Sequence, residues 1–82
     1  GIMPNPSQYQ PAIIIVNNGN ARMAAINIYD VQGRLQSQQT NALVKGENTI
    51  ILDTESLPAG TYFVKVSIDG VLKNTQKIIK LR

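Results

Sequence analysis

Short runs of alternating apolar and polar residues, separated by turn residues, fill most of this 82-residue chain. Successive side chains of a β-strand point to opposite faces of a sheet, so such runs predict strands with one face in a core. The cleanest run spans residues 61–69, where Tyr62, Val64, Val66 and Ile68 alternate with Phe63, Lys65 and Ser67. No stretch keeps a helical period over three turns. We therefore expect an all-β chain.

Five more strands are predicted by the same alternation, at residues 12–16, 23–31, 34–40, 49–53 and 71–81. The first eleven residues contain three prolines, which lack backbone donors, so we expect an extended lead-in or a seventh strand at a sheet edge. Turns are predicted at 17–20, 30–33, 45–48 and 69–70, with a longer connection over 54–60. This arrangement predicts an immunoglobulin-like antiparallel β-sandwich of about seven strands.

The alternation also assigns side chains to the core. The residues expected inside are Ala24, Ile26, Ile28, Ile50, Leu52 and Leu57, with Ile78 and Ile79 as apolar anchors of the last strand. Residues 34–40, in contrast, are mostly polar around one apolar residue, Leu35, which is typical of a strand at a sheet edge.

The composition removes most catalytic chemistry. Without Cys or His, the chain offers no disulfide, no thiolate nucleophile and no imidazole base. Residues 53–55 hold oxygen ligands suited to Ca²⁺ but no calcium-loop pattern, and we interpret them as solvated loop residues. We expect no enzyme activity, no metal site and no cofactor. The carboxylates, most of them at predicted turns, are Asp30, Glu47, Asp53, Glu55 and Asp69.

The net charge of +3 raises the question of an anionic partner. Basic residues in the first 70 positions are scattered rather than aligned, which argues against a nucleic-acid site. Residues 71–82 hold four basic residues and no acidic one. This segment is either an edge strand protected from aggregation by lysines, which composition alone favours, or a basic tag that a partner reads.

Four segments, in order, resemble the C-terminal sorting domains of type IX secretion cargo in Bacteroidetes. Residues 3–6 (MPNP) look like the family's opening Pro-Asn-Pro motif, and residues 26–35 (INIYDVQGRL) look like its central strand and Gly-Arg turn. Residues 57–66 (LPAGTYFVKV) are similar to its Leu-x-x-Gly-x-Tyr strand. Residues 77–80 (KIIK), followed by two more residues, resemble its Lys-rich terminal strand. Each segment alone is common, but the four in this order are specific.

The resemblance implies a non-catalytic secretion signal. Such domains direct a larger cargo protein from the periplasm across the outer membrane, to the cell surface or the medium, and a surface sortase then typically removes them. The implied partners are the outer-membrane type IX translocon, a shuttle protein and the sortase. Residues 1–82 would form a single C-terminal domain. Because the chain opens with Gly1 rather than Met, we expect a piece of a longer protein.

The resemblance also assigns roles to residues. Those expected to contact a partner are Gly33, Arg34, Lys77, Ile78, Ile79, Lys80, Leu81 and Arg82. Those expected to shape turns are Pro4, Asn5, Pro6, Gly60 and Gly70.

A second class of function stays open: an accessory carbohydrate-binding or spacer β-sandwich of a secreted glycan-active enzyme. Such a module needs an exposed aromatic platform or a calcium-bridged loop. Tyr9, Tyr29 and Phe63 are the aromatic candidates, and they fall on different segments. Open sheet edges would also allow a weak homodimer.

Overall fold

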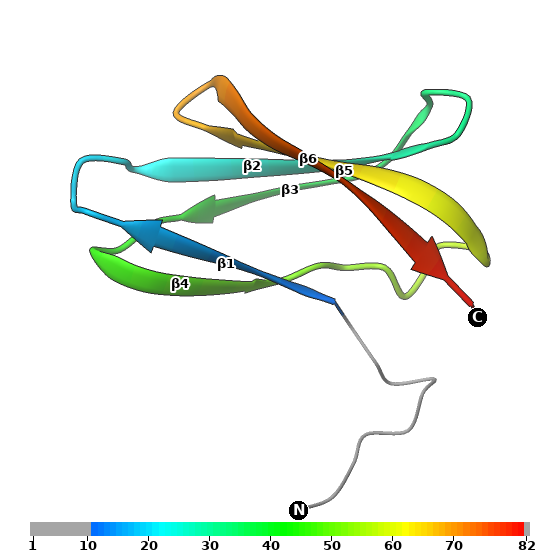
Figure 1. Ribbon diagram of the computed structural model, residues 1–82, viewed down its shortest axis with the longest axis horizontal. Coiled ribbons are helices and arrows are strands. Elements are labelled where there is room, and N and C mark those ends of the chain that lie inside the picture. The colour runs from blue at the N-terminus through cyan, green and yellow to red at the C-terminus, as the bar shows by residue number, and fades with distance from the viewer. Residues whose placement is uncertain (1–10, 82) are drawn as a thin grey trace, which may run out of the picture.

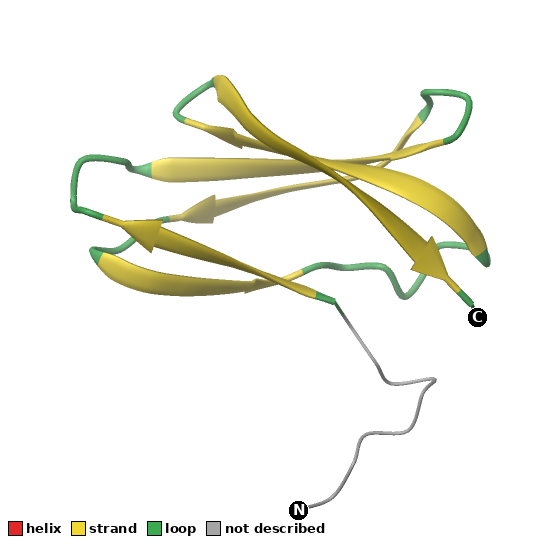
Figure 2. Cartoon of the chain, in the orientation of Figure 1, coloured by secondary structure: helices red, strands yellow, loops and turns green. Residues whose placement is uncertain are grey.

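The computed structural model describes residues 11–81, which form six β-strands and, within that range, no helix (Figures 1 and 2). The all-β prediction is confirmed. The expected seventh strand and the turn residues Pro4, Asn5 and Pro6 lie outside the described residues. The strands are β1 (Ala12–Asn17), β2 (Met23–Asp30), β3 (Leu35–Ala42), β4 (Gly46–Ile51), β5 (Gly60–Ile68) and β6 (Val71–Lys80).

The strands form two antiparallel sheets that stack as two layers (Figure 1). One sheet has four strands in the order β3-β2-β5-β6, and the other pairs β1 with β4. β3 lies at an edge of the larger sheet, as its polar sequence predicts. β6, the last strand, forms the opposite edge of the same sheet and has β5 as its one neighbour among the described strands.

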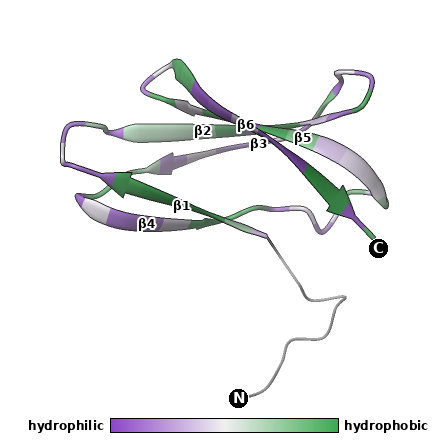
Figure 3. Ribbon diagram, in the orientation of Figure 1, coloured by the Kyte–Doolittle hydropathy of each residue, from purple (hydrophilic) through white to green (hydrophobic). Residues whose placement is uncertain are grey.

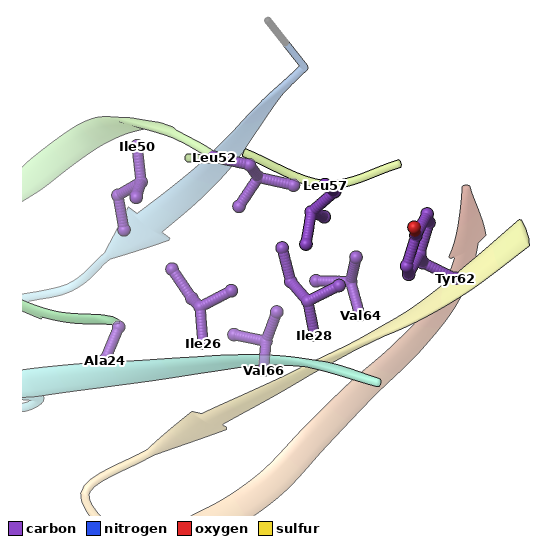
Figure 4. Close-up of a cluster of buried hydrophobic side chains, with 9 residues drawn as sticks. All are labelled: Ala24, Ile26, Ile28, Ile50, Leu52, Leu57, Tyr62, Val64 and Val66. Carbon is purple, nitrogen blue, oxygen red and sulfur yellow. The ribbon is translucent and has the colours of Figure 1, made fainter. Parts of the chain in front are cut away.

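The core lies between the two sheets and follows from the alternation of the sequence (Figure 4). Side chains from β2 and β5 point from one layer, and those of the β4 side point from the other. Every second residue of β2 is buried from Ala24 to Ile28, and the same holds for β5 from Tyr62 to Val66. The buried cluster is Ala24, Ile26, Ile28, Ile50, Leu52, Leu57, Tyr62, Val64 and Val66.

Two expectations need correction. β4 begins at Gly46, so the turn predicted at 45–48 lies earlier in the chain. The reason is Asn48, whose Nδ2 donates to Val44 O at 2.9 Å while its Oδ1 accepts from Val44 N at 2.9 Å. Asn48, a residue type common in turns, therefore lies within the strand and stabilises the turn before it through its side chain. Ile79 is the second correction, because it is 63% exposed rather than an anchor of the core.

Polar side chains also hold other connections together. Asn17 is buried, and its side chain binds the backbone of Gly19, Ala21 and Val44. Asp69, at φ 50°, accepts from the backbone N–H of Met23 at 3.0 Å and so ties the β5–β6 hairpin to the start of β2. Because each bonded group would otherwise need water or another partner, these contacts stabilise the turns of a domain that has no disulfide.

Candidate functional site at the end of the C-terminal strand

β6 divides the predicted recognition residues between two faces. Ile78 is the register partner of the buried Tyr62, and Lys80 is the partner of Gly60, so both lie on the inner side. Lys77 and Ile79 alternate with them and lie on the outer side, where both are exposed. At the Lys-rich end of the strand, Ile78 and Lys80 therefore face the other sheet, and Lys77 and Ile79 face outwards. Leu81, the next residue, is exposed.

Lys80 is held by the backbone of the connection between β4 and β5. Its Nζ donates to the carbonyl oxygens of Thr54, of Glu55 at 3.0 Å and of Leu57 at 2.6 Å. An ammonium group has three donors, and here all three are used within the domain. We call this contact the Lys80 latch. The contact joins the end of β6 to the connection between β4 and β5, which the sequence around Lys80 does not predict.

The same connection contains a second fixed contact. Leu57 and Tyr62 both lie in the core (Figure 4), and Tyr62 Oη donates to Pro58 O at 2.5 Å. A tyrosine that bonds back to the backbone a few residues upstream is the tyrosine corner of many β-sandwiches. Gly60, between them, has a φ of 155°, which favours glycine. The Leu-x-x-Gly-x-Tyr pattern thus corresponds to a buried core residue (Leu57), a bend in the backbone (Gly60) and the tyrosine corner (Tyr62).

The Gly33–Arg34 turn is organised by Asp30. Its Oδ1 accepts from the backbone N–H groups of Gln32 and Arg34, both at 2.9 Å, and its Oδ2 accepts from Arg34 Nε at 2.8 Å. The backbone N–H of Arg34, more than its guanidinium, lowers the pKa of the Asp30 carboxyl below the ordinary 3.8. Gly33 has a φ of 83°, a conformation that other residues rarely adopt.

The structure brings most of the predicted residues to one end of the four-stranded sheet. Asp30 is the register partner of Tyr62, and Tyr62 is the partner of Ile78, so the Gly33–Arg34 turn and the end of β6 flank the start of β5. A shallow groove there is lined by Asp30 and Arg34 on one side and by residues 58–62 on the other. Gly70 lies in the hairpin at the opposite end, with φ 84°, and Arg82 lies outside the described residues.

The outer face of the same sheet holds a group of residues that the sequence did not place together. Tyr29 is the register partner of Phe63 on one side and of Leu35 on the other, and Phe63 is the partner of Lys77. These four residues form a line across all four strands, which we call the outer row. Lys65 lies beside it, with Nζ 5.2 Å from the centroid of the Tyr29 ring. The sequence alone does not predict this line, because it depends on the order of the strands in the sheet.

Other kinds of site are not indicated in the described part of the chain. Within residues 11–81, no three acidic, Cys or His side chains gather where a metal ion would need them. The same range contains no helix with the length and apolar character to cross a membrane. Exposed apolar side chains instead mark the surface, and Figure 3 shows β1 and the end of β6 as hydrophobic.

Comparison with known families gives the identity of the domain. Residues 1–81 match the family described as the secretion system C-terminal sorting domain. The chain belongs to this family. No curated protein and no solved structure matches it. Membership confirms the resemblance drawn from the four segments, and it makes this sorting domain a C-terminal signal for type IX secretion, a non-catalytic function. Its cargo is exported to the cell surface or the extracellular space of Bacteroidetes.

Proposed function

We propose that this sorting domain acts as a folded recognition module, and that the outer-membrane translocon reads the outward residues at the end of β6. The domain forms one unit over residues 1–82 at the C-terminus of its cargo, passes through the periplasm, is delivered by a shuttle protein, and is removed by a surface sortase that cuts upstream of the sandwich. Family membership supports the sorting role.

The observation that carries the proposal is the division of the terminal strand into two faces. Lys80 is engaged by three backbone carbonyls and Ile78 packs against the core, so neither side chain is free for a partner. Lys77 and Ile79 are exposed, and Leu81 is 84% exposed. These outward residues provide a positive charge and apolar surface at one site, next to the Gly33–Arg34 turn.

An export assay tests this function. Residues 1–82 are fused behind a signal peptide and a fluorescent reporter, with native upstream linker, in a host that has type IX secretion. We expect the reporter in the medium or on the surface, and in the periplasm when the domain is omitted. Deleting residues 77–82 is a weak comparison, because the deletion also removes the Lys80 latch and so perturbs the fold. Retention of the intact fusion in the periplasm, with the domain folded, would contradict the proposal.

The carbohydrate-binding alternative gains one observation, because Tyr29 and Phe63 are neighbours on the outer face. Both rings are only half-exposed, and Lys65 Nζ already lies over the Tyr29 ring, 5.2 Å from its centroid. Affinity electrophoresis in polysaccharide gels separates the two functions. Retardation that is lost in Tyr29→Ala and Phe63→Ala variants would favour the alternative, whereas unretarded migration supports the sorting signal.

A further inference from the structure

The outer face of the four-stranded sheet has an uneven distribution of charge. Lys65 on β5 and Lys77 on β6 are exposed on this face. The acidic residues all lie elsewhere: Asp30 and Asp69 cap turns, Glu47 lies on β4 in the other sheet, and Asp53 and Glu55 lie in the connection between β4 and β5. The outer row and Lys65 thus carry two positive charges and no negative one.

The same face exposes apolar surface along the outer row. Leu35 is 50% exposed at one edge of the sheet, and the half-buried rings of Tyr29 and Phe63 continue the row towards Lys77. Ile79 extends the apolar surface along β6. Aromatic and apolar side chains with polar ones around them are typical of surfaces that bind another protein.

We propose that the outer row, together with Lys65, is the docking surface for an acidic protein of the export machinery that also presents apolar side chains. The proposal rests on the sorting function and extends the recognised surface from β6 across β5, β2 and β3. Charge complementarity selects the partner: carboxylates would contact Lys65 and Lys77, while apolar side chains cover the neighbouring rings of Phe63 and Tyr29.

A lipid surface fits this face less well than a protein does. Anionic membranes attract basic segments that contain clusters of about four to eight lysines or arginines. The outer row and Lys65 contain two lysines, at positions 65 and 77. A sheet face whose rings have cross-strand neighbours on both sides is instead suited to a complementary protein surface.

The size of the surface indicates a transient contact. Four strands about 4.8 Å apart and about eight residues long give a face of roughly 15 by 27 Å. The whole face is thus about half of the ~800 Å² that each partner contributes to a standard interface, and the outer row with Lys65 is a part of it. An interface of this size is in the range of transient contacts.

Matched double variants in the export assay test the docking surface. Leu35→Ser with Lys65→Glu changes one apolar and one basic residue on the face, both away from β6. Val44→Ser with Lys45→Glu makes the same chemical changes at exposed residues in the turn before β4. We expect the first pair to lower the exported fraction about tenfold and the second to leave it unchanged, with unaltered unfolding midpoints in both. Lys65→Arg, which keeps the charge, should export normally.

The outcomes separate this inference from the sorting function. Normal export of the Leu35→Ser/Lys65→Glu fusion would overturn the docking surface and leave the sorting function in place, whereas failure of the unsubstituted fusion would overturn both. Flotation with phosphatidylcholine vesicles, with and without phosphatidylglycerol, covers the membrane case. We expect no binding to either. Binding to the anionic vesicles that Lys65→Glu abolishes would replace the protein partner with a lipid surface.

Discussion

Lys80 Nζ donates to the carbonyl oxygen of Leu57 at 2.6 Å, which joins the end of the last strand to a residue whose side chain is buried in the core. Two further carbonyls, those of Thr54 and Glu55, share the same ammonium group. The inner residues of the last strand therefore hold the sandwich together, and they alternate with the outer residues that we propose a partner recognises.

The Lys80 latch predicts a large difference between two neighbouring lysines. Lys80→Met keeps the length of the side chain but removes the donors, and should lower the free energy of unfolding by about 2 kcal/mol because carbonyls lose a charged partner. Lys77→Met, on the outer side, should change it by less than about 0.5 kcal/mol. Urea unfolding of both variants measures this, and equal stabilities would contradict the latch.

The tyrosine corner predicts a cost for one hydroxyl. Tyr62→Phe leaves the ring in the core but removes the bond to Pro58 O, and should destabilise the domain by about 1–1.5 kcal/mol. Tyr29→Phe is the matched control, because the Tyr29 hydroxyl accepts one bond, from Asn27 Nδ2 at 3.3 Å, and lies half-exposed. Chemical unfolding measures both variants. An equal loss of unfolding free energy in the two would contradict a stabilising role of the tyrosine corner.

The two isoleucines of the last strand should behave differently. Ile78 packs against the core cluster, so Ile78→Ala should cost about 1–2 kcal/mol, in the range for a partly buried truncation. Ile79→Ala removes surface that is already exposed and should be close to neutral. Thermal unfolding ranks the two variants, and the reverse order would mean that the faces of β6 are exchanged.

Asp30 predicts a specific dependence on pH. Its folded pKa lies below the unfolded value of about 3.9, so the unfolded state takes up the proton first as the pH falls. The stabilisation by this carboxylate is complete above about pH 5, declines as the pH falls through the unfolded value, and is lost below the folded pKa. Asp30→Asn should therefore unfold at a lower temperature than the wild type at pH 7, and the gap should narrow in acid. A gap that stays constant down to acid pH would contradict this role.

The sequence predicts the strands and the core because both depend on local alternation. Ile26 and Ile28 on β2, and Val64 and Val66 on β5, are buried as the pattern requires. The pattern fails at Ile79, because two adjacent isoleucines in a strand must face opposite sides and only one of them can be inside. It also fails at Asn48, whose amide acts from inside β4 on the turn before it.

The candidate site is less visible from the sequence, for a physical reason. The resemblance names Lys77 to Arg82, but cannot tell that Lys80 is bound by residues 23 to 26 positions away. The outer row depends on the order β3-β2-β5-β6, which brings Leu35 and Lys77 to opposite edges of one sheet. Contacts between residues distant in the chain follow from topology, and local patterns do not encode strand order.

The most direct test of the account compares the two ends of β6 in the export assay. One fusion has Lys77→Gln with Ile79→Ser at the terminal end, and its control has Lys73→Gln with Leu72→Ser, which changes exposed residues at the hairpin end. The exported fraction and the folded state of each are measured beside the unsubstituted fusion. We predict that the terminal-end variant is folded but stays in the periplasm, while the control is exported. Export of the terminal-end variant at the unsubstituted level would contradict recognition through the outward residues of the last strand.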